Sequence, residues 1–138
     1  MKVKYVAQEQ EHGCVVACIA MVLGWDYGDV ADYFQNDFDK SGVKLDFAKT
    51  FICEHGFSVI EKRPEGFMDI KQSNKRMLEP FAQIHIVGGS QFIDAKHNHA
   101  FVMDKNGKTW NPGNQKHPDP MNDYYSINRV CGFWRENS

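Results

Sequence analysis

The sequence lacks a strong charge of either sign, a long hydrophobic run and an apolar leader. Its 138 residues carry 16 Lys and Arg against 18 Asp and Glu, a net charge of −2, which gives no electrostatic basis for binding nucleic acid. The most apolar stretch, Val15 to Leu23, is too short to span a bilayer. No secretory signal is visible between Met1 and Gly13. We therefore expect neither nucleic acid nor a membrane as a partner.

The sequence also lacks a disulfide framework, internal repeats, low-complexity segments and linkers. Its four cysteines, at positions 14, 18, 53 and 131, follow no spacing typical of a disulfide-rich protein. Without a signal peptide, this pattern predicts reduced thiols and a cytoplasmic location. The apolar fraction of 42% and the length fit a single globular domain, which we place at residues 1–138.

Helical periodicity dominates the first part of the chain and strand periodicity the second. Helices are predicted at 14–23, from Gly28 to 34, at 45–55 and, as a short segment, within 68–78. Strands are predicted at 57–61, 81–87, 99–103, 108–110 and 124–134, with a hairpin turn at Asn106-Gly107 and a break at 88–90. Residues 2–7 fit either an edge strand or a segment lying over the surface. Helices followed by strands indicate an α+β domain with an antiparallel sheet.

Cys14 stands where a polar run ending at Gly13 changes into an apolar, helix-forming stretch. This places the thiol in the first turn of a buried helix, where backbone N–H groups are unpaired and the helix dipole is positive. Both favour the thiolate, which is the nucleophilic form of cysteine. The pattern therefore indicates an enzyme that attacks a carbonyl carbon with Cys14.

A nucleophilic cysteine needs a base, and the base needs a group that orients it. His99 begins an apolar strand after a polar loop, so its side chain can reach a cleft from a rigid element. Asn111 follows across the predicted hairpin and can accept the imidazole N–H. Gln8 precedes the nucleophile and, with the backbone N–H of Cys14, can form an oxyanion hole.

The remaining cysteines and histidines have simpler interpretations. Cys18 is interpreted as a packing residue, Cys53 and Cys131 as structural residues, and His85 as a hydrogen-bonded histidine of the core or of a sheet edge. A metal site built from His12, Cys14 and Cys18 with His97 and His99 was weighed as an alternative. Its spacing matches no familiar zinc pattern, so neither a metal nor another cofactor is predicted.

The order Gln, Cys, His, Asn resembles that of papain-like cysteine peptidases, most closely the bacteriocin-processing peptidases that remove double-glycine leaders. The residues that carry the resemblance run through most of the chain: Gln8, Cys14-x-x-Ala17-Cys18-x-x-Met21, Gly42-x-x-Leu45, Gly56-Phe57, Pro80-Phe81-x-x-Ile84, His99-x-Phe101-Val102 and Asn111-Pro112-Gly113. The resemblance implies a papain-like fold whose nucleophile helix packs on the antiparallel sheet. It also implies a peptide or protein substrate.

By position, the resemblance assigns the oxyanion hole to Gln8, the nucleophile to Cys14, the base to His99 and the orienting group to Asn111. The implied reaction is cleavage of a peptide or isopeptide bond through a Cys-His-Asn triad. The family has Asp where this chain has Asn111, and an acidic residue and Gly where this chain has Gly13 and Val15. The alternatives are a non-catalytic peptide-binding module on the same fold, or a deamidase or acyl transferase that uses the same triad.

Overall fold

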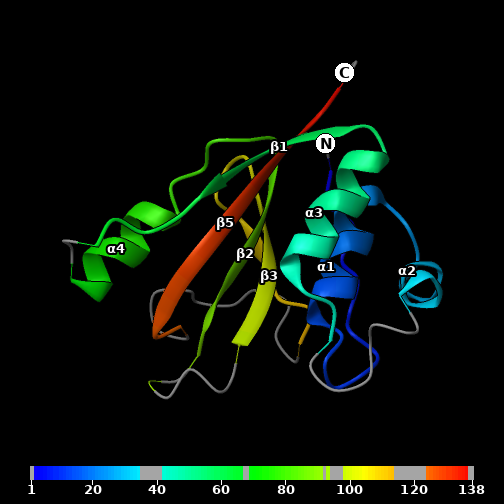
Figure 1. The fold of residues 1–138 in the computed structure, drawn as a ribbon, viewed down its shortest axis with the longest axis horizontal. Helices are drawn as coiled ribbons and strands as arrows, with labels where there is room; N and C mark the ends of the chain where they lie inside the picture. The colour runs from blue at the N-terminus through cyan, green and yellow to red at the C-terminus, as the bar shows by residue number, and fades with distance from the viewer. Residues whose placement is uncertain are drawn as a thin grey trace.

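Helices precede strands along the chain, with one further helix between the first two strands. The computed structural model describes residues 2–34, 42–66, 69–91, 93, 98–113 and 124–136. In chain order the elements are α1 (Cys14–Leu23), α2 (Tyr27–Tyr33), α3 (Leu45–Glu54), β1 (Phe57–Lys62), α4 (Ile70–Met77), β2 (Ile84–Ser90), β3 (Asn98–Asp104), β4 (Thr109–Trp110) and β5 (Ser126–Arg135) (Figure 1). The predicted α+β class is confirmed.

The strands form one sheet in the order β1-β5-β2-β3-β4, and every pairing in it is antiparallel. The hairpin predicted at Asn106-Gly107 joins β3 to β4. Gly107 has a φ of 86°, a left-handed conformation that glycine adopts without steric cost. The hairpin brings the residues after β4 back beside the start of β3, where the candidate base lies.

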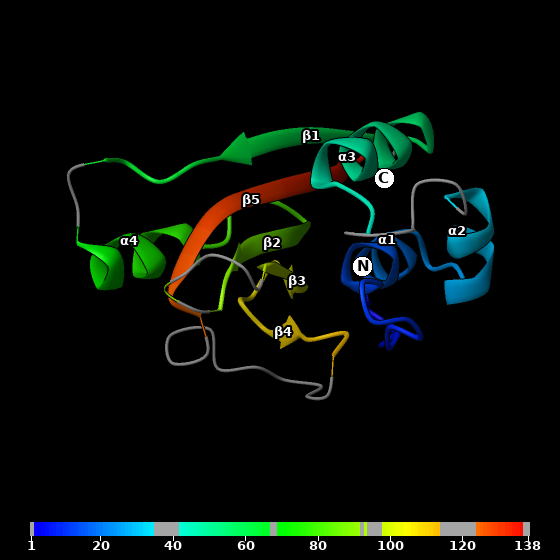
Figure 2. The same ribbon diagram turned by 60° about the horizontal axis from the view of Figure 1, so that its bottom comes forward.

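Each face of the sheet supports its own apolar core. Helices α1 and α3 pack together on one face, with α2 outside α1 (Figure 2). Alternate strand residues such as Ile84, Ile86 and Val102 point into the core beneath these helices. Their neighbours Val87 and Phe101 point the other way, into a second cluster that includes Met77 of α4. This alternation follows from the two-residue period of a strand.

The boundaries of α1 agree with the prediction. The helix begins at Cys14 and ends before Gly24, whose φ of 73° allows its N–H to bond the carbonyl of Ala20. Eight of its ten residues are buried, and α1 contacts α2, α3 and β3. No single described helix is long and apolar enough to cross a membrane; α1 and α2 meet that test only as a pair, which is bent by 117°.

The second strand differs from its prediction at both ends. It begins at Ile84, because the backbone N–H groups of Phe81 and Ala82 bond a side chain instead of a neighbouring strand. It continues through Gly88-Gly89-Ser90, where a break had been predicted. A Cβ on Gly89 would lie 2.5 Å from the carbonyl oxygen of Ser126. The glycine therefore permits a close approach between β2 and β5 at the point where their register shifts.

Other predictions on loops and the first residues have mixed outcomes. Residues 2–7 form no strand, in agreement with the surface-segment alternative. The polar loops predicted at 37–42 and 113–122 lie almost entirely outside the described residues. The short helix within 68–78 is present as α4.

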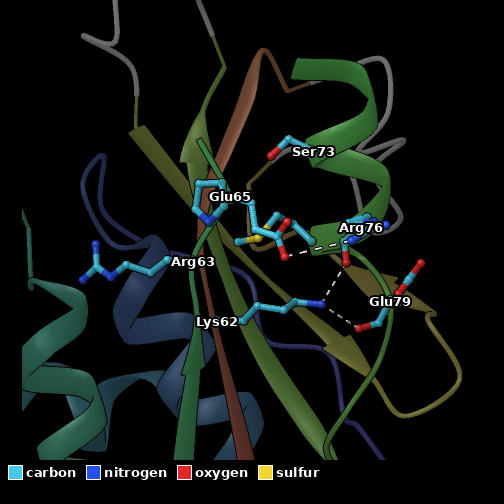
Figure 3. A pocket seen from close by; sticks show the side chains of 8 residues that line it. Lys62, Arg63, Glu65, Ser73, Arg76 and Glu79 are labelled. Atoms are coloured by element: carbon cyan, nitrogen blue, oxygen red, sulfur yellow. Dashed lines mark hydrogen bonds and ion pairs between the residues drawn. The ribbon is translucent and has the colours of Figure 1, made fainter. Parts of the chain in front are cut away.

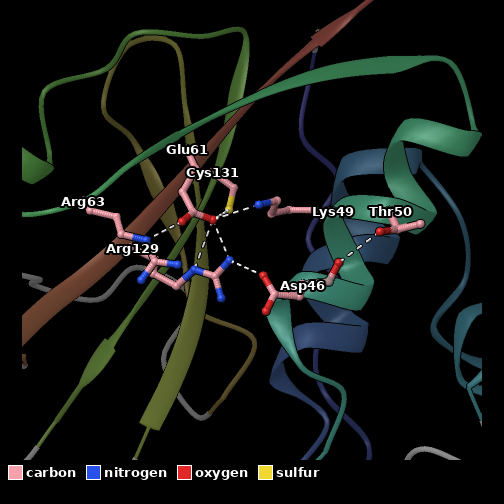
Figure 4. Close-up of polar contacts among 7 residues, drawn as sticks. All are labelled: Asp46, Lys49, Thr50, Glu61, Arg63, Arg129 and Cys131. Carbon is pink, nitrogen blue, oxygen red and sulfur yellow. Dashed lines mark hydrogen bonds and ion pairs between the residues drawn. The ribbon is translucent and has the colours of Figure 1, made fainter.

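A polar cluster fixes α3 to β1 and β5 (Figure 4). Glu61 of β1 accepts hydrogen bonds from Arg129 Nη2 at 2.5 Å, Lys49 Nζ at 3.1 Å and Arg63 Nε at 2.5 Å. Arg129 also bonds Asp46 of α3 at 2.7 Å. Burial alone would raise the pKa of Glu61, but its cationic partners lower that pKa to about 2. The carboxylate therefore stays ionised and holds the three elements together.

A pocket with charged walls lies between the end of β1 and α4 (Figure 3). The ammonium group of Lys62 donates to the carbonyl oxygens of Arg76 at 2.8 Å and Glu79 at 3.1 Å. A cation at these carbonyls stabilises the C-terminal end of α4. In Figure 1, α4 lies at the other end of the molecule from α1, so this pocket is separate from the candidate nucleophile.

Candidate active site

Cys14 lies at the first position of α1, where that helix meets β3. The backbone N–H groups of Cys14 itself, Val15 and Ala100 lie near enough to the sulfur to lower the pKa of the thiol. Ala100 follows His99 directly on β3, so the thiol lies beside the strand that carries the candidate base. Among the residues that the structure describes, no hydrogen bond joins Cys14 Sγ to the His99 ring.

The electrostatics of Cys14 differ from the expectation based on the helix end alone. Burial raises the pKa of the thiol above its ordinary value of 9.0, although the three N–H groups act in the opposite direction. The sequence indicates the N–H donors at the helix end but not how deeply the sulfur is buried. Burial has the larger effect on the pKa of the thiol. The direction of this shift favours the neutral thiol in the resting site. Cys18 is fully buried, and burial raises its pKa well above 9.0.

The structure brings His99 and Asn111 together as predicted from the hairpin. The ring nitrogen Nε2 of His99 lies 2.5 Å from Oδ1 of Asn111. The same Oδ1 accepts the backbone N–H of Gly113 at 3.0 Å. Because Oδ1 already accepts from Gly113, the amide is oriented with its oxygen toward the histidine. His99 must therefore donate from Nε2, and this tautomer leaves the lone pair on Nδ1.

The surroundings of His99 favour its neutral form. Burial lowers the pKa of the imidazole below its ordinary value of 6.5, and the hydrogen bond to Asn111 only partly offsets this. The ring also stacks on Tyr124, with the centroids 6.3 Å apart. Near neutral pH the residue is thus an uncharged acceptor with a fixed tautomer, which is the state that a general base requires.

Gln8 lies close to the other candidates, but its amide nitrogen is engaged elsewhere. Nε2 donates to the carbonyl oxygens of Gln10 and Glu11, each at 3.1 Å, while its Oε1 is buried. The backbone N–H of Gln8 bonds the carbonyl of Pro112 at 2.8 Å. The residue is therefore next to the Asn111 turn, and its side-chain amide bonds the loop before Cys14.

Tyr27 is a residue at this site that the sequence analysis did not identify. Its hydroxyl donates to Oε1 of Gln10 at 2.7 Å and occupies the space where a Cβ on Gly13 would lie, only 2.1 Å away. The absence of a side chain at Gly13 therefore leaves room for a tyrosine of α2. No local sequence pattern would show this contact. Val15, by contrast, is 8% exposed and packs in the core.

This close fit predicts that Gly13→Ala destabilises the fold by about 1–3 kcal/mol, the usual cost of overpacking. Gly13 has φ −94° and ψ 11°, which alanine tolerates, so the cost arises from the contact with Tyr27. Urea unfolding should show a smaller cost in a Tyr27→Phe background. Gly28→Ala is a matched control because a Cβ there has open space. Equal costs of Gly13→Ala in both backgrounds would contradict the steric explanation.

The other candidate residues do not form a second site in the described part of the chain. No three His, Cys, Asp or Glu side chains among the described residues converge as metal ligands, and His97 lies outside them. Burial, aided by the adjacent Glu61, raises the pKa of Cys131 to about 12. Cys53 is half-buried, and its pKa is also raised by burial.

Comparisons with known proteins support the fold. No family model matches the chain, and a search of curated proteins finds no match. Among solved structures, it is similar to a double glycine motif protease from an AMS/PCAT transporter, crystallised in complex with the leader peptide. The TM-score is 0.64 at 17% identity, covering 97% of this chain and 92% of that one. The chain thus shares a papain-like fold with that protease over nearly its full length.

Proposed function

We propose that this protein is a cysteine peptidase in which Cys14 is the nucleophile, His99 the base and Asn111 the orienting group. The observation that carries the proposal is the pair of hydrogen bonds on Asn111 Oδ1, one from His99 and one from Gly113. Together they select the tautomer with a free lone pair on Nδ1.

In the proposed reaction, Nδ1 of His99 takes the proton of the Cys14 thiol as the sulfur attacks the carbonyl carbon of the substrate. The raised pKa of Cys14 and the lowered pKa of His99 keep both groups neutral until the substrate arrives. The imidazolium then protonates the leaving amine, and a thioester remains on Cys14. Water, activated by the neutral imidazole, hydrolyses that thioester and restores the thiol.

The developing oxyanion needs hydrogen-bond donors within reach of Cys14. The backbone N–H of Cys14 is one such donor, since it lies at the start of α1 where no helical acceptor is available. Gln8 supplies the second donor when its Nε2 turns away from the carbonyls of Gln10 and Glu11. We therefore expect the oxyanion hole to be completed on substrate binding.

For the substrate we propose a peptide with small residues before the cleaved bond, which the similarity to a double glycine motif protease in complex with a leader peptide supports. The location that we propose is the cytoplasm. A non-catalytic peptide-binding module is the second candidate, favoured by the neutral Cys14 and its lack of a direct bond to His99. Deamidation would use the same residues on a side-chain amide, and acyl transfer would use them with an acceptor other than water.

Alkylation by iodoacetamide tests the assignment of Cys14. We expect Cys14 to react faster than Cys18, which is fully buried and one helical turn deeper. Its rate should rise with pH through the alkaline range, because the raised pKa leaves little thiolate near neutrality. Mass spectrometry locates the label, and hydrolysis of a fluorogenic peptide ending in Gly-Gly should fall in proportion to labelling.

Cys18→Ala is the matched control for this experiment and should retain both the labelling and the hydrolysis. Labelling of Cys18 in preference to Cys14 would contradict the choice of nucleophile. If Cys14 is labelled rapidly, and the unlabelled protein binds the peptide without ever cleaving it, the result would support the binding module instead.

A further inference from the structure

The segment from Tyr5 to Gln8 contacts the turn that carries Asn111. The hydroxyl of Tyr5 donates to the carbonyl oxygen of Asn111 at 2.8 Å and lies 3.3 Å from that of Gly113. The backbone N–H of Gln8 donates to the carbonyl of Pro112 at 2.8 Å. Two of three consecutive carbonyls of the turn therefore accept hydrogen bonds from one short segment more than 100 residues earlier in the chain, and the third lies near the same hydroxyl.

We propose that the Tyr5 hydroxyl is a positioning group for His99, which acts by holding the Asn111 turn in place. This inference rests on the proposed function, since it assigns a role in the same reaction. Among the described residues, no hydrogen bond joins Tyr5 to the imidazole. Tyr5 bonds the main chain of the residue whose side chain bonds the imidazole, so its effect passes through Asn111.

The geometry of the turn makes this main-chain bond relevant to the side chain. Asn111 Oδ1 accepts from His99 and from Gly113 at once, so the two donors must lie on either side of one oxygen. Asn111 comes directly after β4, a strand of only two residues. A short strand constrains the chain beyond it weakly, and the Tyr5 bond supplies a fixed point at the residue where the orientation matters.

Tyr5 is chemically suited to this task. Its phenol spans the distance from the surface segment to the turn, and burial raises its pKa, so that the hydroxyl remains a donor throughout the range in which His99 acts as a base. Phenylalanine would keep the ring and its partly buried contacts with the core while removing only the donor. The substitution Tyr5→Phe therefore separates positioning from packing.

The test is Tyr5→Phe in the full chain, with hydrolysis of the fluorogenic Gly-Gly peptide as the activity. We expect kcat to fall about 10-fold with KM within twofold, because a small displacement of a reacting group costs rate more than binding. In an Asn111→Ala background, Tyr5→Phe should cause no further loss, since its effect requires the Asn111 side chain. Tyr33→Phe, at an exposed tyrosine of α2, should change neither constant.

A second readout does not depend on activity. In the unmodified protein, the imidazole nitrogen resonances of His99 should show Nε2 protonated and Nδ1 bare; Tyr5→Phe should shift them toward a mixture of the two tautomers. Unchanged His99 resonances, or an equal fall in activity with and without the Asn111 side chain, would overturn the inference. A chain that never cleaves the peptide but still shows the tautomer shift would contradict the proposed function and uphold the role of Tyr5.

Discussion

Asn111→Ala is expected to lower kcat/KM by roughly 10²- to 10⁴-fold, the range seen when a catalytic histidine loses its orienting partner. Alanine cannot accept the Nε2 proton of His99, so the imidazole is free to place its proton on Nδ1, the nitrogen that must stay bare. Steady-state hydrolysis measures the loss. Asn106→Ala, at the exposed hairpin turn, is a matched control expected to remain within twofold.

Asn111→Asp should retain much of the activity, because a carboxylate oxygen can accept both hydrogen bonds. A negative charge beside His99 favours the imidazolium and so raises its pKa. Since the base works only when neutral, the acid limb of the pH profile should move to higher pH. Full activity of Asn111→Ala would remove Asn111 from the mechanism and leave at most a dyad of Cys14 and His99.

The second large effect is expected at His85, which is fully buried in β2. Its Nε2 accepts the backbone N–H groups of Phe81 and Ala82, both at 3.0 Å, and its Nδ1 lies 3.0 Å from the carbonyl of Met103. Two donors on Nε2 require that nitrogen to be unprotonated, so Nδ1 donates to Met103. His85→Ala leaves a cavity and three backbone groups without a partner, which should cost about 3–5 kcal/mol of unfolding free energy in urea.

The same contacts make stability depend on pH. Burial lowers the folded-state pKa of His85 below its ordinary value of 6.5. The unfolded chain therefore binds the proton first, and the contribution is complete above pH 6.5 and lost as the pH falls below it. The contribution of His99 to stability depends on pH in the same direction, since its pKa is also lowered.

Urea unfolding at pH 8 and pH 5 measures this dependence. His85→Phe should be less stable than the unmodified protein at pH 8 but lose less stability on acidification. His12→Ala, at an exposed side chain, should follow the unmodified protein. If the free energy of unfolding falls equally on acidification with and without His85, the assignment of its protonation state would be contradicted.

The elements that could be predicted from the sequence are those determined by local pattern. The α1 helix combines a long apolar run with Gly24 as its stop signal, and both ends agree with the structure. The hairpin could be predicted from Asn106-Gly107. Because the hairpin was predicted, the proximity of His99 and Asn111 could be predicted too. In these cases the signal lies within a few residues of the feature it predicts.

What could not be predicted depends on residues far apart in the chain. Gly88-Gly89 reads locally as a strand break, whereas it allows β5 to approach β2 closely. The contacts of Tyr27 with the Gly13 loop, and of Tyr5 with the Asn111 turn, follow no local pattern. The pKa of Cys14 likewise depends on how much of the folded protein surrounds the sulfur, which the helix position alone does not determine.

The place of β5 in the sheet constrains the order of events during synthesis. This strand pairs with β1 on one side and β2 on the other, so neither gains that partner until residues 126–135 have left the ribosome. The nascent chain must carry α1, α3 and the β2-β3-β4 hairpins with one edge of β2 open. An open edge is a template for pairing with other chains, so we expect the growing polypeptide to be most prone to association before β5 joins the sheet.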